Sequence, residues 1–365
     1  MKTIKTKQTG YPVWIEIDRK KLRENLAAIR SVAPNNPIMA MIKCNAYGMG
    51  IEVVAKTLIS DGVNIFGVCD SRDALVLRKM SKEITIVNFS PRTSAELEKF
   101  KGKNITPVIM SAEEDLTSLE KSVYIKVNTG LNRWGLSVEE TLVIAQKLKG
   151  SGVIIEALCT TLLETDADKA QISKLKKLTR TLKKNDIAPK YISYASSQSL
   201  TSAPINDGSI LRIGILLYGL YPDKESEIEQ KISVSHIFSL KSRICQIRLL
   251  QKGDSILYKN KFTAFKKMRI ALLPIGYSHG YPVQLAGKAE VLVRGIRCRV
   301  LGITMSSIII DVTSIKDAAI YDEVVLIGSQ DGSSITPAEV SDIASISCYV
   351  LINSFSHSIK HKTVS

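Results

Sequence analysis

Residues 37–60, PIMAMIKCNAYGMGIEVVAKTLIS, contain the repeating unit that decides the fold of this chain. An apolar run at 37–44 has the composition of a buried strand, and a glycine-containing turn leads from it into a helical pattern at 51–60. The same alternation continues to about residue 220. Strands are expected at 37–44, 64–70, 84–89, 105–110, 123–129, 153–160, 190–196 and 210–216. Eight buried strands with intervening helices predict an α/β fold, a closed (β/α)8 TIM-like barrel.

The pattern changes after the acidic stretch 221–229. Short strands separated by Gly, Asp and Ser turns are expected at 241–250, 255–258, 268–275, 289–300, 307–312 and 323–327, with one helix at 337–344. We therefore expect a barrel domain at 1–230 and a mostly β C-terminal domain at 231–365, with residues 11–17 joining the β domain as a strand. The basic run 357–362 is expected to be a solvated tail.

Composition excludes several classes of protein. With 45% hydrophobic and 23% charged residues, the 365-residue chain can bury a core and is not disordered as a whole. The net charge of +15 raises the question of nucleic acid, but much of the excess lies on one predicted amphipathic helix at 169–184. Since aromatic residues are few and no recognition motif accompanies the charge, we expect no nucleic-acid partner.

Targeting and metal signals are also missing from the sequence. No apolar run reaches the roughly 20 residues of a membrane helix, and no secretory signal is visible, so we expect no membrane association. The six cysteines are scattered and fit reduced thiols of a cytoplasmic protein. The four histidines lack the spacing of metal ligands, and no metal is expected.

The carboxyl ends of the strands are where a barrel carries its functional groups. Lys43 ends the first strand, and loss of solvation there favours the neutral, nucleophilic amine. Lys126 is a second lysine within a strand, the fifth, and Arg133, one loop later, is suited to bind a carboxylate. Arg212 lies on the apolar eighth strand and needs a buried partner, while Gly214 allows close approach of a ligand to the backbone. Taken singly, each also has an ordinary structural interpretation, such as a snorkelling lysine before a glycine turn.

Taken together, the strand ends KCNAYGMG (43–50), KVNTGLNRWG (126–135) and RIGILLYG (212–219) resemble the alanine racemase family. The resemblance continues through GDSILYKNKFTA (253–264), PIGYSHG (274–280) and GITMSSIIIDV (302–312), in order along nearly the whole chain. It implies an isomerase with pyridoxal 5'-phosphate as cofactor, a barrel followed by a β domain, and interconversion of L- and D-alanine. The usual role of such an enzyme is cytoplasmic D-alanine biosynthesis, which provides a peptidoglycan precursor.

The resemblance also implies a role for each matching residue. Lys43 would bind the cofactor covalently and act as one base at Cα, and Tyr258 would act as the second base on the opposite face. Lys126 matches a lysine that family members often carry as a carbamate. The other matches are Tyr47, Ser197, Gly214 and Ile215 for the cofactor phosphate, Arg212 for the pyridine nitrogen, Arg133 and Met305 for the substrate, and Tyr277 for the entrance. Family members place the tyrosine of one subunit over the lysine of the other, so a homodimer with a shared active site is implied.

Several positions depart from the family pattern and leave alternatives open. Thr161 falls where the family has a ring-stacking histidine, and further departures lie at Ser193, Ser196, Gly302, Ser306 and Cys348. These changes are compatible with a racemase of another amino acid, such as serine or lysine. A pyridoxal phosphate-dependent decarboxylase and a non-catalytic cofactor-binding protein are weaker alternatives. Tyr258 argues against the decarboxylase, and the second domain argues against the single-barrel binding protein.

Overall fold

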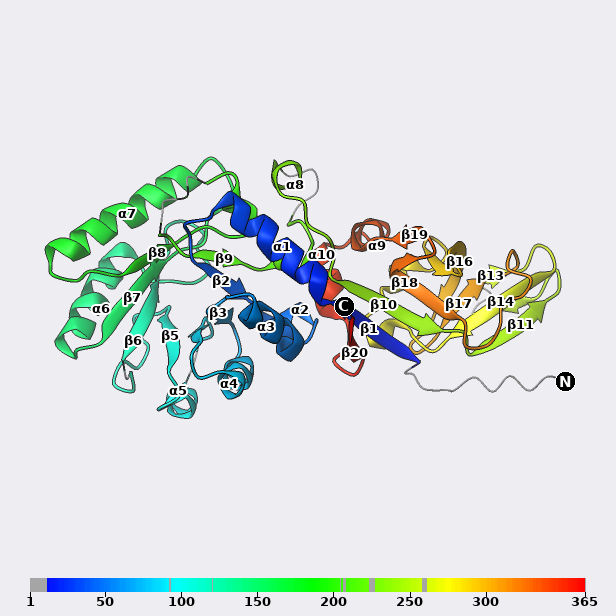
Figure 1. Ribbon diagram of the computed structural model, residues 1–365, viewed down its shortest axis with the longest axis horizontal. Helices are drawn as coiled ribbons and strands as arrows, with labels where there is room; N and C mark the ends of the chain where they lie inside the picture. The colour runs from blue at the N-terminus through cyan, green and yellow to red at the C-terminus, as the bar shows by residue number, and fades with distance from the viewer. Residues whose placement is uncertain are drawn as a thin grey trace. The chain divides into compact units, whose positions relative to one another are not determined.

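The computed structural model describes residues 12–364 except 92, 120, 204, 206, 207, 223–226 and 258–260. The chain divides into two compact units (Figure 1). One unit is Arg19–His236, and the other combines the residues up to Asp18 with those from Ile237 onward.

The first unit is built on an eight-stranded sheet in which every neighbouring pair is parallel. Its strands are β2 (Ile38–Met41), β3 (Ile65–Val68), β4 (Thr85–Asn88), β5 (Ile105–Ile109), β6 (Ser122–Lys126), β7 (Ile154–Cys159), β8 (Tyr191–Ser193) and β9 (Leu211–Ile213). Backbone hydrogen bonds from Ile210 to Ile192 and from Arg212 to Ala195, both 3.0 Å, bring β9 beside β8. The expected (β/α)8 barrel is confirmed.

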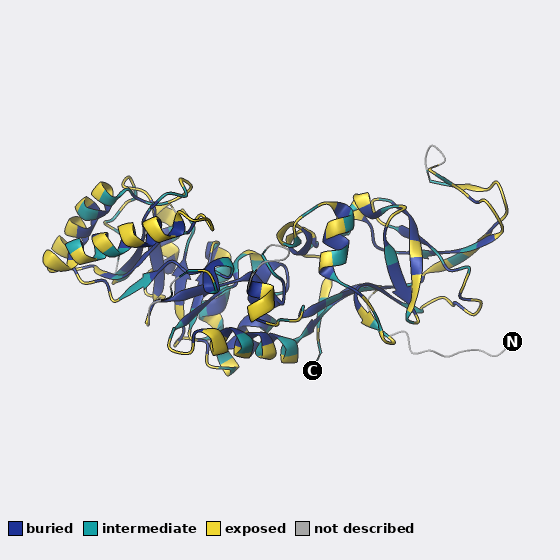
Figure 2. Cartoon of the chain, turned by 90° about the horizontal axis from the view of Figure 1, so that it is seen from above, coloured by how far each residue is buried: buried dark blue, intermediate teal, exposed yellow. Residues whose placement is uncertain are grey.

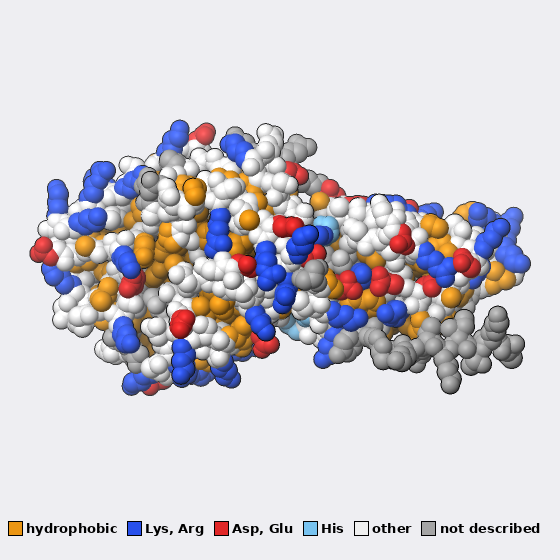
Figure 3. Space-filling model, viewed as in Figure 1, with side chains coloured by type: hydrophobic (Ala, Val, Ile, Leu, Met, Phe, Trp, Pro, Cys, Tyr) orange, Lys and Arg blue, Asp and Glu red, His pale blue; other side chains and the backbone are white. Residues whose placement is uncertain are grey.

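Helices alternate with most of the strands, although β5 leads to β6 without one, and they cover the outside of the barrel. They are α1 (Arg19–Val32), α3 (Ile51–Ser60), α4 (Ser71–Met80), α5 (Ser94–Phe100), α6 (Val138–Gly150) and α7 (Asp168–Lys184), followed by the shorter η1 (Gln198–Leu200), η2 (Ile215–Tyr218) and α8 (Glu227–Lys231). Each long helix buries one apolar stripe and exposes the opposite face (Figure 2). The lysines and Arg180 of α7 lie on its solvent side, where basic side chains gather in Figure 3.

Alternate residues of the strands fill the barrel. Met39, Val108, Tyr124, Ala157 and Ile210 belong to one buried cluster. Because side chains in a strand alternate between faces, residues two positions further along point to the same side. This rule places Lys126, Cys159, Ser193 and Arg212 in the interior layer at the carboxyl ends of their strands.

The second unit is mostly antiparallel sheet. Its strands are β1 (Val13–Asp18), β10 (Phe238–Arg243), β11 (Gln246–Leu250), β12 (Ser255–Ile256), β13 (Phe262–Thr263), β14 (Met268–Leu273), β15 (Glu290–Val293), β16 (Ile296–Ile303), β17 (Ile308–Asp311), β18 (Glu323–Gln330), β19 (Ser333–Ile335) and β20 (Lys360–Val364). The helical elements are η4 (Tyr277–His279), η5 (Val283–Leu285), α9 (Pro337–Ala344) and α10 (Cys348–Ser354). The expected single strand at 289–300 is a hairpin, because Arg294 and Gly295 turn the chain with φ of 51° and 71°.

The end of the chain differs from the sequence prediction. The segment 357–362 was expected to be a solvated tail, and this expectation is wrong. β20 pairs in parallel with β1, which itself pairs antiparallel with β10. The Lys362 ammonium lies 4.3 Å from the centre of the Trp14 ring, so this basic residue covers an aromatic side chain of the sheet.

Candidate active site

Lys43 lies at the start of an unusual turn. The expected strand 37–44 ends at Met41, and α2 (Lys43–Tyr47) follows with Cys44, Asn45, Ala46 and Tyr47 all in the left-handed region, at φ of 54–55°. Left-handed backbone costs roughly 1–2 kcal/mol per residue for side chains other than glycine. Backbone strain of this kind is concentrated at functional sites.

Specific hydrogen bonds hold this left-handed turn. The Asn45 N–H donates to the Asp73 carboxylate at 3.1 Å, and the Asn45 side-chain oxygen accepts from the Ile51 N–H at 2.9 Å. The Lys43 ammonium nitrogen lies 5.7 Å from the centre of the Tyr47 ring. The turn therefore brings the candidate nucleophile and the candidate phosphate ligand together at the carboxyl end of β2.

Tyr47, Ser197 and Gly214 meet although they are far apart in sequence. The Gly214 N–H donates to the Ser197 hydroxyl oxygen at 3.0 Å. A Cβ added to Gly214 would lie 2.4 Å from the Tyr47 hydroxyl, so only glycine leaves room here. The Tyr47 ring packs on Tyr218 at a centroid distance of 4.7 Å, and Ile215 begins η2 directly after Gly214. Two hydroxyls and the start of a short helix thus form a group of the kind that holds a phosphate.

Arg212 is buried, with 8% of its surface exposed, and its partners are neutral. One guanidinium nitrogen donates to the Ser193 carbonyl at 2.8 Å and to the Ser193 hydroxyl at 2.6 Å, and the other donates to the Thr160 carbonyl. Ser193 in turn donates to the Ile210 carbonyl at 2.7 Å. Burial lowers the pKa of Arg212. Because these carbonyl and hydroxyl partners carry no negative charge, they orient the guanidinium without neutralising it.

Lys126 is buried beside Thr161, whose hydroxyl accepts a hydrogen bond from the lysine amine. Burial lowers the pKa of Lys126 to about 8, and the positive charges of Arg212 and Arg133 contribute to this shift. Arg133 itself is exposed in the loop after β6. A lysine with this pKa has a large neutral fraction at mildly alkaline pH, which is the form that reacts with electrophiles.

Tyr277 and Met305 lie in the second unit and are neighbours there. The Tyr277 N–H donates to the Thr304 carbonyl and the Ser278 N–H to the Met305 carbonyl, both at 3.0 Å. The side chains of Tyr277 and Met305 are 47% and 60% exposed.

Tyr258, the predicted second base, lies outside the described residues. Of the departures from the family pattern, Thr161 contacts Lys126, Ser193 contacts Arg212, Ser196 contacts Glu164, and Cys348 accepts from Ser341.

Sequence reasoning missed a set of buried polar residues behind this site. Gln171, Thr129 and Thr160 are all buried and hydrogen-bonded to one another. The one indication in the sequence is that Gln171 lies on the apolar face of the 169–184 helix, where a buried amide requires hydrogen-bond partners.

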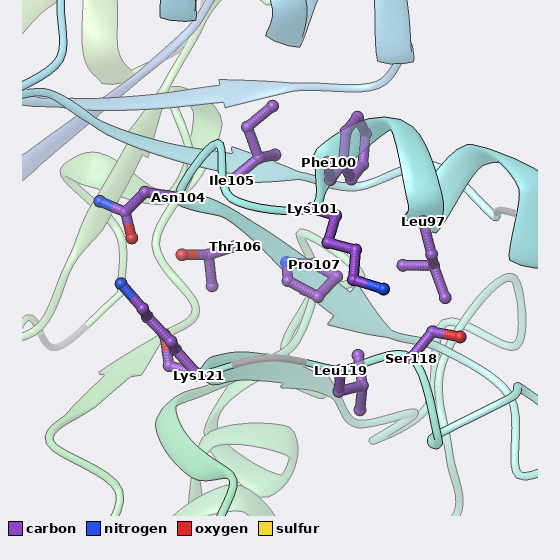
Figure 4. Close-up of a pocket in the computed structure, with 11 residues that line it drawn as sticks. Leu97, Phe100, Lys101, Asn104, Ile105, Thr106, Pro107, Ser118, Leu119 and Lys121 are labelled. Atoms are coloured by element: carbon purple, nitrogen blue, oxygen red, sulfur yellow. The ribbon is translucent and has the colours of Figure 1, made fainter.

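A separate pocket lies away from this site. It is lined by residues of α5 and by the first residues of β5 and β6, among them Phe100, Thr106, Pro107 and Lys121 (Figure 4). It is therefore at the amino ends of the strands, opposite the end that carries Lys43 and Arg212.

In the described part of the chain, no group of three or more His, Cys, Asp or Glu side chains could hold a metal. No helix within the described ranges is long and apolar enough to cross a membrane.

Comparison with known proteins decides the family. Residues 17–222 match the model of the alanine racemase N-terminal domain, and residues 237–363 match that of the C-terminal domain. The alanine racemase of Clostridium kluyveri is 31% identical over 357 residues, covering 93% of this chain and 91% of that protein. The chain belongs to the alanine racemase family. The resemblance seen in the sequence is confirmed.

Solved structures of this family share the fold. An alanine racemase of Clostridium difficile 630 superposes with a TM-score of 0.90 at 25% identity, over 98% of this chain and 97% of that one. A histidine racemase from Leuconostoc mesenteroides superposes with a TM-score of 0.87 at 26% identity, over 97% and 98% of the two chains. Proteins of this fold are therefore named for different amino acids.

Alanine racemase family members depend on pyridoxal 5'-phosphate, and the residues of this chain fit that group. The Tyr47 and Ser197 hydroxyls and the side-chain-free Gly214 form a cradle that a Cβ would fill. Arg212 provides a buried cation without a neutralising partner in its hydrogen-bond set, and Lys43 provides the amine that such a cofactor needs.

Proposed function

We propose that the protein is a pyridoxal phosphate-dependent racemase that interconverts L- and D-alanine with Lys43 and Tyr258 as its two bases. The observation that carries the proposal is the convergence of Lys43, Tyr47, Ser197, Gly214 and Arg212 in one barrel unit. Family membership supports the reaction, and the curated relatives are named for alanine. We place the reaction in the cytoplasm, where D-alanine would serve as a peptidoglycan precursor.

The cofactor, when bound, acidifies the Cα proton of an attached amino acid by withdrawing electrons. Inversion at Cα needs one group that removes this proton and another that returns a proton to the opposite face. The Lys43 amine is the first such group and the Tyr258 phenol the second. Tyr47, Ser197 and Gly214 would hold the phosphate, and Arg212 would supply a positive charge beside the pyridine nitrogen, which would disfavour protonation of that nitrogen.

Lys126 is proposed to carry a carbamate in this enzyme. Its neutral amine would attack carbon dioxide, form an N–C bond and release one proton, and leave an anionic group. The pKa of about 8 supports this step because it makes the neutral amine abundant. The new charge would pair with Arg133, which would then be oriented toward a substrate carboxylate, with Met305 as a further substrate contact and Tyr277 at the entrance.

The quaternary structure proposed is a homodimer in which Tyr258 of one subunit serves the site of Lys43 in the other. Mixing the inactive variants Lys43→Ala and Tyr258→Phe tests both the two bases and the sharing. At equal amounts, half of the dimers are mixed and each holds one intact site, so about one quarter of the native activity should return. No recovery after subunit exchange, verified by native mass spectrometry, would contradict the shared site.

The substrate is a separate question, because a histidine racemase is as similar in structure as several alanine racemases. Thr161 replaces a family histidine and is much smaller, which favours racemisation of a larger amino acid as the second candidate function. Chiral chromatography after incubation with each L-amino acid tests this. We expect D-alanine to form fastest, and a larger D-amino acid forming at least tenfold faster would overturn the assignment to alanine.

A further inference from the structure

Gln171 reaches from helix α7 to the ends of strands β6 and β7. It is 3% exposed, and all of its amide groups are used. The side-chain oxygen accepts from the Leu163 N–H at 2.8 Å. The side-chain nitrogen donates to the Thr129 hydroxyl at 2.9 Å and to the Thr161 carbonyl at 3.2 Å. An exposed helix surface residue would have none of these partners.

The donor and the acceptor of every hydrogen bond in this group can be assigned, because the group ends at backbone atoms that can only donate or only accept. The Leu163 N–H can only donate and the Thr161 carbonyl can only accept, so the orientation of the Gln171 amide is fixed. The Thr160 hydroxyl donates its one proton to the Val127 carbonyl at 2.8 Å. In its 2.7 Å contact with Thr129 it must therefore accept. Each donor therefore points the same way: Gln171 donates to Thr129, Thr129 donates to Thr160, and Thr160 donates to the Val127 carbonyl after β6.

This hydrogen-bond network contacts Thr161 and Thr160, the residues that bind the Lys126 amine and the Arg212 guanidinium. The Thr161 carbonyl accepts from Gln171 while its hydroxyl accepts from the Lys126 amine. The Thr160 carbonyl accepts from Arg212 while its hydroxyl is held through Thr129. The backbone and side chains of two consecutive residues therefore connect one glutamine to Lys126 and to Arg212.

We propose that Gln171 is a positioning residue that fixes where the Lys126 side-chain nitrogen and the Arg212 guanidinium lie relative to the bound cofactor and substrate. The inference rests on the proposed function and adds to it a residue on a helix outside the barrel. Gln171 touches neither cofactor nor substrate. It acts by holding Thr160 and Thr161 in place, since an unsatisfied carbonyl or hydroxyl in this buried layer would shift to find another partner.

Two substitutions remove the hydrogen bonds in different ways. Gln171→Met keeps the length and volume but loses every donor and acceptor of the amide. Gln171→Glu keeps the shape and the bond from Leu163, but its carboxylate cannot donate to Thr161 or Thr129. Leu175→Ala is the matched control, because Leu175 is fully buried one helical turn further along the same face and its loss destabilises α7 without touching this group.

Four measurements, of kcat, cofactor affinity, cofactor absorption and Tm, separate positioning from stability. For Gln171→Met we expect kcat to fall by about tenfold or more, in line with other residues that orient ligand-contacting groups. We expect the affinity for pyridoxal phosphate to change less than about threefold, because Tyr47, Ser197 and Gly214 hold the phosphate independently. The absorption maximum of the bound cofactor, or its pH dependence, should shift because Arg212 faces the ring. Leu175→Ala should lower Tm at least as much without changing kcat or the spectrum.

Equal kcat and unchanged spectra in Gln171→Met and the native protein would overturn the proposal. So would a loss of kcat in Leu175→Ala that matches the loss in Gln171→Met at the same change in Tm. The spectra do not depend on turnover. If the native protein racemises no amino acid, the proposed function fails, while a spectral shift confined to the Gln171 variants still supports positioning and its absence still overturns it.

Discussion

Substituting Gly214 by alanine tests the phosphate cradle with the addition of one carbon atom. Gly214 has φ of −118° and ψ of −91°, so the substitution adds no left-handed strain, and the largest effect is expected from the contacts of the new Cβ. That atom would lie 2.4 Å from the Tyr47 hydroxyl oxygen and 3.2 Å from the ring carbon that bears it. Ordinary contact begins near 3.4 Å, so the hydroxyl must retreat by about 1 Å.

Tyr47 cannot retreat freely. Its ring packs on Tyr218, and its backbone belongs to the left-handed turn after Lys43. We therefore expect the hydroxyl to leave the position from which it can bind a phosphate. A hydrogen bond to a charged group contributes about 1.5–3 kcal/mol, which corresponds to an increase of about 10- to 100-fold in the Kd for pyridoxal phosphate.

Titration of the apoprotein with pyridoxal phosphate, followed by absorbance, measures this Kd. Gly150→Ala is the control, because Gly150 ends α6 and nothing lies within 4 Å of its added Cβ. The control should bind the cofactor like the native protein. A Kd for Gly214→Ala within threefold of the native value, with a native-like Tm, would refute the assignment of this cradle to the phosphate.

Three further predictions concern stability. Burial lowers the pKa of Lys126 from 10.5 to about 8, so the buried charge opposes folding below pH 8 and ceases to do so as the pH rises toward 10.5. Lys126→Met should therefore gain up to about 3 kcal/mol over the native protein at pH 7 and less at pH 10, in urea unfolding without carbon dioxide; an equal gain at both would contradict this. Burial lowers the pKa of His236 to about 4, so native stability should fall as the pH drops from 6.5 to 4. His236→Gln should reduce the loss of unfolding free energy between pH 6.5 and 4 by up to about 3 kcal/mol. An unchanged pH profile of stability in this variant would contradict the role of His236. Ser193→Ala removes the hydroxyl that accepts from Arg212 and should destabilise by about 1–3 kcal/mol in the same assay, whereas Ser196→Ala should change stability little; similar losses in both would argue against a special role for Ser193.

The barrel and its site cations could be predicted because strand patterning carries that information. Lys126 and Arg212 lie within apolar runs in which side chains alternate, and alternation places them in the interior layer. The partners of Arg212 could not be predicted, since a serine hydroxyl and two carbonyls leave no charge pattern in the sequence. Gln171 was missed for the same reason, because its role depends on which strand ends lie beside α7.

Two local features were mispredicted for physical reasons. The strand expected at 37–44 ends at Met41, and the following turn adopts left-handed backbone at Cys44, Asn45, Ala46 and Tyr47, of which only asparagine favours that region, so the residue types do not indicate this turn. The end of the chain, 360–364, reads as polar because β20 lies at the edge of the sheet and has no fully buried residue. Edge strands keep the composition of solvated segments, and only pairing with β1 reveals them.

Proton NMR of the cofactor-loaded protein in D2O, with L-alanine and a panel of other L-amino acids, tests the two-base racemase most directly. We expect loss of the Cα proton signal together with growth of the D-enantiomer, with alanine the fastest. In the Tyr258→Phe variant, incubated with each enantiomer of alanine in turn, inversion should be lost while Lys43 still exchanges the Cα proton of the one enantiomer whose proton faces it. Exchange without any inversion in the native protein, or no exchange with any amino acid at full cofactor occupancy, would contradict a two-base racemase.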